Sequence, residues 1–235
     1  MLVDNAETCA NVGLIGRYGA DWFRGLGTSA SPGSALISLT GAVKHPTVLE
    51  VAMGTPIRQV LEVAGADTNA QAVLLGGYGG QWLDAAHLDV AYANESLGPI
   101  GVAVGAGVMV VLPRSACGIA ETQRIVRWMA NESARQCGPC AFGLPAIAED
   151  LAQLATSSRD PRAAYQRLVE RCGLIEGRGA CGHPDGVVRM VRSALEVFAH
   201  DFADHMSGSP CAGSRSPERF ASVPTIERAE ELVWE

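Results

Sequence analysis

Two cysteines separated by two residues, with a third about forty residues further on, restrict the fold of this chain more than any other feature of its sequence. Cys137 and Cys140 form a C-x-x-C pair, and Cys181 lies in a glycine-rich turn. Two close soft ligands and a distant one can enclose a metal centre, and thiolates suit both zinc and iron–sulfur clusters. Three positions before Cys137, where another thiolate would complete a C-x-x-C-x-x-C run, the residue is Ala134.

Upstream of these cysteines, the apolar pattern predicts a compact β-grasp unit. Residues 35–41 and 47–51 are strand-like runs on either side of a turn. Thr55 and Pro56 then provide an N-cap and a proline at the first position of a helix that extends through Ala64. Two more strands are expected at residues 71–75 and 102–112. A hairpin, one helix and further strands together make this unit.

Around and beyond the C-x-x-C pair, apolar residues recur at spacings of three and four, as on one face of a helix. The first two expected helices bracket the pair, and the turn before the last helix supplies Cys181. The predicted fold class is therefore α+β, a β-grasp domain followed by an α-helical bundle. The expected helices cover residues 119–130, 144–154, 161–172 and 187–202.

The same patterns give the expected domain boundaries. An N-terminal helix and linker precede the β-grasp domain, and a C-terminal tail follows the bundle. In chain order, these parts are residues 1–34, 35–113, 114–208 and 209–235.

Composition and charge exclude several classes of function. A formal net charge of −7 argues against nucleic acid as a partner, because nucleic-acid binding depends on neutralising phosphates. The longest apolar run, residues 100–112, is too short and too interrupted by glycine to span a bilayer, and no signal peptide is expected. Seven cysteines without secretory context favour ligands or free thiols over disulfides. We therefore expect a cytoplasmic protein without a transmembrane segment.

The residues around the C-x-x-C pair resemble those of a known family. Residues 132–140 are similar to the E-S-C-G-x-C-x-P-C run of the NADH-binding flavoprotein subunit of respiratory complex I, which has relatives in NAD-reducing hydrogenases and formate dehydrogenases. Residues 3–12 resemble the V-N-N-V-E-T-L-x-N-V segment of the same family. The resemblance covers nearly the whole chain up to about residue 205, but only the C-terminal half of the family's subunit. Residues 35–113 would correspond to its soluble-ligand-binding β-grasp domain.

The resemblance implies an iron–sulfur electron-transfer module. In the family, electrons pass from NADH to FMN, then to a [4Fe–4S] cluster held by four cysteines, and on to clusters in partner subunits. Cys137, Cys140 and Cys181 occupy three of those four positions, and Ala134 occupies the other. The fourth ligand is therefore open between a water molecule, no ligand at all, which would give a [3Fe–4S] cluster, and three side chains. These candidates are Cys172, Cys211 and His183.

The resemblance also bears on flavin and nucleotide binding. Asp4, Asn5 and Thr8 match family residues that lie along the flavin, so residues 1–34 would be a remnant of the edge of the flavin domain. No G-x-G-x-x-G phosphate loop occurs in the chain, and we interpret the glycine cluster at 76–80 as a loop between strands. FMN and NAD are therefore expected only with a separate flavin domain or partner subunit. The family activity is that of an NADH dehydrogenase (quinone), and we expect the isolated chain not to oxidise NADH.

Three other interpretations of the cysteines remain open. The tetrad C-G-P-C is identical to the thioredoxin motif, although residues 125–130 before it have helical spacing rather than that of a buried strand. Cys137, Cys140 and Cys181 with His183 would also make a Cys₃His set for structural zinc. In the third interpretation the bundle binds no metal, and the chain is a binding or assembly module that uses its β-grasp surface.

The remaining cysteines and histidines predict no site of their own. Cys9 and Cys117 have no close partner in the sequence and are expected to be free or core thiols. His200 and His205 lie beside aspartates on the last expected helix, which suggests a face in contact with solvent.

Overall fold

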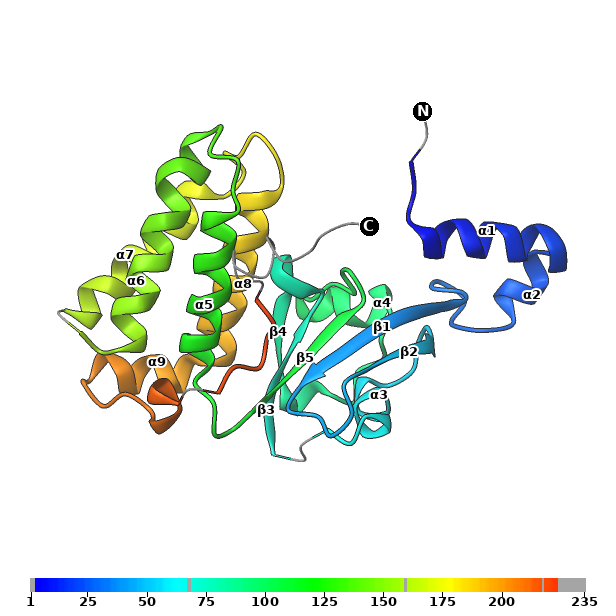
Figure 1. The fold of residues 1–235 in the computed structure, drawn as a ribbon, viewed down its shortest axis with the longest axis horizontal. Coiled ribbons are helices and arrows are strands. Elements are labelled where there is room, and N and C mark those ends of the chain that lie inside the picture. The colour runs from blue at the N-terminus through cyan, green and yellow to red at the C-terminus, as the bar shows by residue number, and fades with distance from the viewer. Residues whose placement is uncertain (1–2, 67–68, 159, 217, 224–235) are drawn as a thin grey trace, which may run out of the picture. The chain divides into compact units, whose positions relative to one another are not determined.

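The computed structural model of the protein describes residues 3–66, 69–158, 160–216 and 218–223, which form two compact units (Figure 1). One unit comprises the described residues up to Gly77 together with Leu83–Val111, and the other comprises Tyr78–Trp82 and the described residues from Leu112 onward. The main helices and strands are, in chain order, α1 (Ala6–Tyr18), α2 (Ala20–Arg24), β1 (Ser34–Gly41), β2 (Thr47–Ala52), α3 (Ile57–Val63), β3 (Ala70–Leu75), β4 (Gln81–Asp84), α4 (Asn94–Leu97), β5 (Val108–Pro113), α5 (Gly118–Asn131), α6 (Leu144–Ala155), α7 (Pro161–Ile175), α8 (His183–Val197) and α9 (Ala199–Met206).

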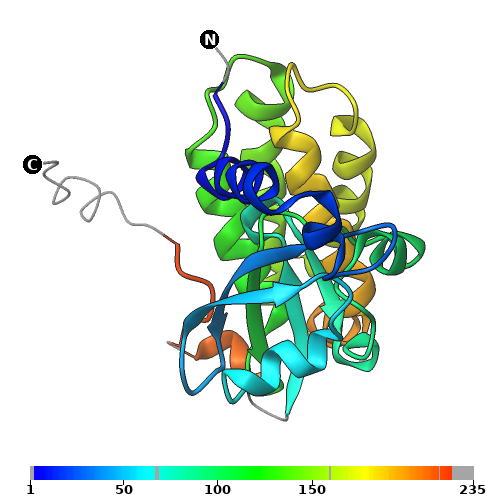
Figure 2. The same ribbon diagram turned by 90° about the vertical axis from the view of Figure 1, so that its right-hand side faces the viewer.

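The first unit is built on a mixed five-stranded sheet with the order β2-β1-β5-β3-β4. β1 pairs with β2 in an antiparallel hairpin and with β5 in parallel. Figures 1 and 2 show α3 and the strands of this sheet from two sides. A mixed sheet in this order with one helix packed across it is the β-grasp topology. The expected fold class, α+β with a β-grasp domain before a helical region, is confirmed.

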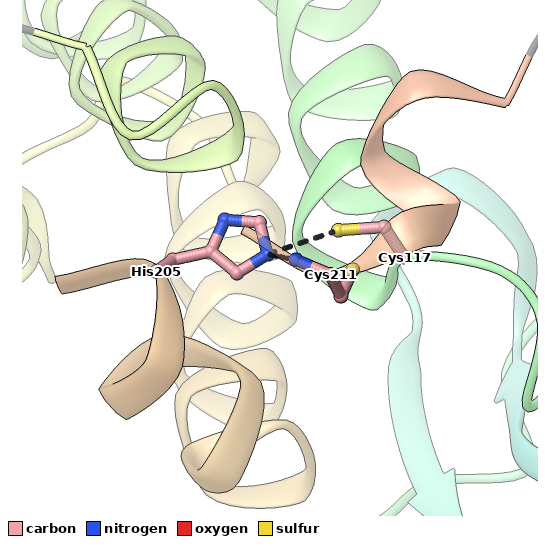
Figure 3. Close-up of side chains that lie close together, drawn as sticks. All are labelled: Cys117, His205 and Cys211. Carbon is pink, nitrogen blue, oxygen red and sulfur yellow. Dashed lines mark hydrogen bonds between the residues drawn. The ribbon is translucent and has the colours of Figure 1, made fainter. Parts of the chain in front are cut away.

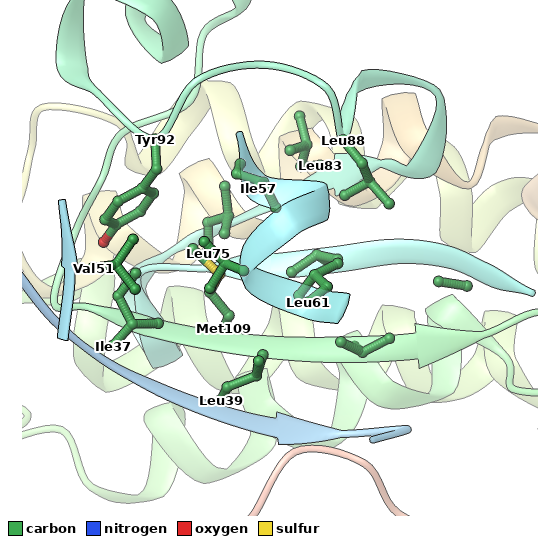
Figure 4. Packing of buried hydrophobic residues seen from close by; sticks show 14 of the residues in the cluster. Ile37, Leu39, Val51, Ile57, Leu61, Leu75, Leu83, Leu88, Tyr92 and Met109 are labelled. Carbon is green, nitrogen blue, oxygen red and sulfur yellow. The ribbon is translucent and has the colours of Figure 1, made fainter. Parts of the chain in front are cut away.

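The core of this unit lies between α3 and one face of the sheet. α3 buries Ile57, Val60 and Leu61, which share one face because they are three and four residues apart. Ile57 and Leu61 point toward strand residues such as Ile37 and Met109 (Figure 4), and all four side chains are at most 4% exposed. Burial of each stabilises the fold by about 1.5–3 kcal/mol, which is why the helix packs on the sheet.

One sequence-based strand boundary in this unit is wrong, and one strand was missed. The strand expected at residues 102–112 begins only at Val108. Gly101, Gly105 and Gly107 have φ values of 73°, 65° and 67°, a left-handed conformation that cannot continue a strand. The short strand β4 was not predicted, because four residues directly after a glycine-rich loop give almost no alternation to recognise.

The second unit contains the helices α5 to α9. Helices are present in all four expected regions, but the last one, expected at 187–202, is wrong in its extent. α8 begins at His183 and ends at Val197, and α9 follows after Phe198, whose φ of −105° and ψ of 26° interrupt the regular helix. Among the residues that the structure describes, no helix combines the length and apolar character needed to cross a membrane.

The described residues from Ser207 onward, which we call the C-terminal segment, contact α5. The Phe220 N–H donates to Glu121 Oε1 at 3.2 Å, and Arg124 donates to the Ala221 carbonyl. Glu121 is only 5% exposed and forms an ion pair with Arg124 at 2.6 Å. The segment is therefore held along the helix by backbone groups as well as by side chains.

Candidate metal centre

The three predicted cysteine ligands lie in two neighbouring turns, although their sulfur atoms are not all within 4.8 Å of one another. Cys137 and Cys140 lie between α5 and α6, and Cys181 lies just before α8. The backbone N–H of Ala180 is close enough to Cys137 to affect its pKa, so the C-x-x-C turn is next to the turn that carries Cys181. Cys140 is close enough to the other two thiols to be affected by their charge.

The three thiols differ in their surroundings. Cys140 is 4% exposed, whereas Cys137 is half-buried and Cys181 is exposed. The N–H groups of Ala180 and Cys140 hold the pKa of Cys137 below its usual value. Burial, followed by the hydrogen bond and the negative charge of Cys137, raises the pKa of Cys140 to about 11. Negative charges on neighbouring thiolates repel one another, and a bound cation would offset this repulsion. The three thiols are therefore suitable ligands for a cation.

The local backbone around Cys137 and Cys140 is unusual. Pro139–Gly143 forms a π-helical turn that leads into α6, and such turns occur frequently at functional sites. Arg135, two residues before Cys137, has a φ of 54°, in the left-handed region that residues other than glycine seldom adopt. The chain thus enters and leaves the cysteine pair through irregular backbone, and the pair faces the turn before α8.

The turn before α8 is held by two features. The Asp185 carboxylate, in the first turn of α8, accepts the Gly177 N–H at 2.9 Å. A Cβ atom at residue 179 would lie 2.6 Å from the Cys181 carbonyl oxygen and from the Pro184 ring, so only glycine fits there. Both features restrict the backbone of the turn that carries Ala180 and Cys181.

The candidates for the fourth ligand have different positions. Ala134 is exposed in the loop before Cys137 and offers no donor atom in its side chain. His183 Nε2 lies 3.0 Å from the Met129 carbonyl oxygen, so this nitrogen donates its proton to the last turn of α5. Cys172 is 2% exposed on the inner face of α7, and burial raises its pKa to about 11. Its electrostatic neighbours are Arg192 and Glu176.

Cys211 belongs to a second group, with Cys117 and His205 (Figure 3). One ligand atom from each of these residues lies within 4.8 Å of the others, and no other such group of three occurs among the described residues. Cys117 is the N-cap of α5, and Cys137 follows the other end of this 14-residue helix. At about 1.5 Å per residue, the helix separates its two ends by about 21 Å. We therefore do not assign Cys211 to the centre of Cys137.

This second group corrects two expectations from the sequence. His205 is 0% exposed rather than in contact with solvent, because it shares the buried face of α9 with Phe202, three residues earlier. Cys117 is 2% exposed as expected for a core thiol, but it has close partners. No sequence signal identified the group, because Cys117 and His205 are 88 residues apart.

The residues matched to the flavin edge all lie at the start of the chain and are exposed. Asp4 accepts the Asn5 N–H at 2.8 Å, and Asn5 caps α1 by accepting the Glu7 N–H at 2.7 Å. Thr8 lies in the first turn of α1. Glu7 in turn accepts the Leu36 N–H at 2.7 Å, which connects α1 to β1.

Comparison with known proteins gives a family model and several relatives. Residues 120–205 match the NADH-ubiquinone oxidoreductase-F iron-sulfur binding region. The NADP-reducing hydrogenase subunit HndC of Solidesulfovibrio fructosivorans is 30% identical over 214 residues, which cover 89% of this chain and 44% of that subunit. The F-type subunit of the Escherichia coli NADH-quinone oxidoreductase is 30% identical over 205 residues, covering 85% of this chain and 46% of the relative. The chain thus spans about half the length of the curated relatives it matches.

Solved structures share the fold. An NAD+-reducing [NiFe]-hydrogenase in the H2-reduced state superposes with a TM-score of 0.78 at 24% identity, over 97% of this chain and 37% of the hydrogenase chain. The air-oxidised state of an NAD+-reducing [NiFe]-hydrogenase gives a TM-score of 0.75 at 25% identity, over 92% of this chain and 40% of the other. Over most of its length, the chain is therefore a homologue of the C-terminal part of the F-type subunits of NADH-quinone oxidoreductases and of the hydrogenase subunit HndC, and its residues 120–205 match the iron–sulfur binding region of that family.

Proposed function

We propose that this chain is an iron–sulfur electron-transfer module whose cluster is held by Cys137, Cys140 and Cys181. The single observation that carries the proposal is the proximity of the two cysteine-bearing turns, since Ala180 affects the pKa of Cys137 and Cys181 affects the pKa of Cys140. Both turns lie inside the matched iron–sulfur binding region, residues 120–205.

The surroundings of the three thiols suit a cluster of this kind. When bound, an iron–sulfur cluster takes up and releases single electrons. The backbone N–H groups of Ala180 and Cys140 lower the pKa of Cys137 and so favour its thiolate, and N–H groups near a sulfur ligand raise the reduction potential of a bound centre. The exposed Cys181 and the half-buried Cys137 leave one side of the site open to a partner. Electron exchange therefore requires no opening of the helical bundle.

We propose that only three protein ligands bind the cluster. Cys172 remains in the core of the bundle, and His183 keeps its proton donated to Met129. The position that a thiolate at residue 134 would occupy is then filled by water or left without iron. The first arrangement gives a [4Fe–4S] cluster and the second a [3Fe–4S] cluster.

We further propose that the module works in the cytoplasm with other oxidoreductase subunits or with a separate flavin domain. The curated relatives are named as subunits, of a hydrogenase and of NADH-quinone oxidoreductases. FMN and NAD would be bound by such a partner, and Asp4, Asn5 and Thr8 would contribute at most one edge of the flavin site. The exposed position of these three residues at the start of α1 is compatible with a partner there.

The proposal is tested by anaerobic reconstitution of the chain with ferrous iron and sulfide, followed by metal analysis and EPR spectroscopy. We expect a brown, oxygen-labile protein, and we expect Cys137→Ser, Cys140→Ser and Cys181→Ser each to lose most of the iron. Cys9→Ser, at an exposed thiol on α1, is the matched control and should keep it. If these three variants contain as much iron and sulfide as the parent, the cluster assignment is wrong. Zinc bound by these residues without iron or sulfide would instead identify a structural site.

A further inference from the structure

The group formed by Cys117, His205 and Cys211 has no part in the proposed function, and its geometry is that of a ligand set. Figure 3 shows the three side chains converging from α5, α9 and the C-terminal segment. Cys117 Sγ lies 3.8 Å from His205 Nε2, and the two sulfur atoms lie within 4.8 Å of each other. Cys117 and His205 are buried, and Cys211 is half-buried.

The hydrogen bonds of His205 determine which ring nitrogen faces the thiols. Nδ1 lies 2.8 Å from the Leu154 carbonyl oxygen, and because a carbonyl oxygen can only accept, Nδ1 carries the proton. Nε2 therefore carries no proton, and its lone pair accepts the Cys211 N–H at 3.0 Å. Histidines that bind metals have this arrangement, with one ring N–H donated to a carbonyl or carboxylate and the other nitrogen on the ligand side.

The charges of the group also suit a metal ion. The Cys117 sulfur accepts the Ala120 N–H at 3.4 Å at the N-terminus of α5, where the helix dipole favours a thiolate. Two thiolates and one neutral imidazole cancel the charge of a divalent cation. Sulfur and imidazole ligands together favour zinc among the common divalent ions.

We propose that Cys117 Sγ, Cys211 Sγ and His205 Nε2 bind a single Zn²⁺ ion. The metal takes over the lone pair that now accepts the Cys211 N–H, and water fills the fourth coordination position. A cavity of about 280 Å³, lined by residues that include Cys117, Glu121 and Gly213, adjoins the group and provides both the water and an entry path.

The ion would fasten the C-terminal segment to the bundle. Beyond Cys211 the segment passes so close to α5 that a Cβ at Gly213 would lie 2.5–2.6 Å from backbone atoms of Ser115 to Cys117. Further on, it is held by the contacts of Phe220 and Ala221 with Glu121 and Arg124. Without the metal, the described connection of Cys211 to α9 is the hydrogen bond from its N–H to His205 Nε2 at 3.0 Å.

The test uses the full chain purified with added zinc, and a variant with Cys137→Ser, Cys140→Ser and Cys181→Ser, which removes the thiols proposed for the iron–sulfur cluster. We expect about one zinc per chain in both. Zinc K-edge X-ray absorption should show two sulfur ligands at about 2.3 Å and one imidazole nitrogen at about 2.0–2.1 Å. In the triple variant, Cys117→Ser and Cys211→Ser should each lower the affinity for Zn²⁺ at least tenfold, whereas Cys9→Ser should not.

Limited proteolysis covers the case in which Cys117→Ser does not fold. Zinc should protect the C-terminal segment of the triple variant from cleavage, and adding Cys211→Ser to that variant should abolish the protection. The proposal is overturned if the triple variant retains no zinc, or if its zinc is unaffected by Cys117→Ser and Cys211→Ser. A Cys117–Cys211 disulfide in protein purified with zinc and without reductant, detected as the loss of two hydrogens by mass spectrometry, would also overturn it. None of these outcomes depends on whether iron binds to Cys137.

Discussion

The two ends of α5 carry cysteines in opposite surroundings. At its C-terminal end, Cys137 and Cys181 are at least partly accessible, and backbone N–H groups hold the pKa of Cys137 below its usual value. At its N-terminal end, Cys117 and His205 are almost completely buried, and the ring of His205 is oriented by a carbonyl group. A centre that exchanges electrons with a partner needs access, whereas an ion that fastens a segment needs enclosure. The difference in exposure therefore fits the two metal sites that we propose, which the length of α5 places about 21 Å apart.

The largest expected effect is that a single substitution removes one metal and leaves the content of the other unchanged. Cys140→Ser should remove nearly all of the iron while zinc stays at about one per chain, because it deletes a ligand at one end of α5 only. Cys211→Ser should do the reverse. Inductively coupled plasma mass spectrometry of both variants measures their iron and zinc content and checks this prediction. A variant that loses both metals would mean that the two ends are not independent.

The next effect concerns the reactivity of the thiols in the metal-free chain. The lowered pKa of Cys137 means that it forms thiolate at lower pH, whereas Cys117, with a pKa of about 12, stays protonated until strongly alkaline pH. Between about pH 6 and 9, iodoacetamide should therefore modify Cys137 more than tenfold faster than Cys117, since the thiolate is the nucleophile. Peptide mapping by mass spectrometry measures both rates. Equal rates in the folded chain would contradict the difference in surroundings.

A smaller effect is expected on stability at the enclosed end. Gly213→Ala places a methyl group against the backbone of Ser115 to Cys117, and such overpacking typically costs about 1–3 kcal/mol. We expect a loss of about 1 kcal/mol, because the C-terminal segment can shift outward, together with weaker zinc binding. The matched control is Gly173→Ala on α7, where an added Cβ atom has no other atom within 4 Å. This substitution should stabilise the helix slightly, because alanine favours helices more than glycine does. Urea unfolding followed by circular dichroism compares the two variants.

Sequence and structure agree where the information is local. The C-x-x-C pair and its flanking helices follow from residue spacing, and the hairpin and the helix after it follow from alternation and a proline near the helix start, although Thr55 does not cap α3. The group of Cys117, His205 and Cys211 could not be predicted, because its members are single residues brought together only by tertiary packing. His205 was misplaced because a polar residue next to aspartates resembles a solvated one, and its hydrogen bond to Leu154 is visible only in three dimensions.

The smallest expected effect tests whether the accessible end lacks one ligand. Residue 134 lies in the exposed loop between α5 and Cys137, where the family has a cysteine. Ala134→Cys should slow the oxidative loss of the cluster about twofold, because cluster stability depends on thiolate ligation. If the parent holds a [3Fe–4S] cluster, the same change should raise the iron content from about three to about four atoms per chain.

Gln136→Cys, at another exposed position in the same loop, is the matched control for Ala134→Cys. It adds a thiol where the family motif has none and should change neither quantity. EPR spectra distinguish the two cluster types, because the oxidised [3Fe–4S] signal should disappear in Ala134→Cys and the reduced [4Fe–4S] signal should appear. If Ala134→Cys behaves like Gln136→Cys, the backbone around Arg135, with its left-handed φ of 54°, does not direct residue 134 toward the cluster. The accessible end of α5 would then be a three-ligand site by its geometry and not by the loss of one cysteine.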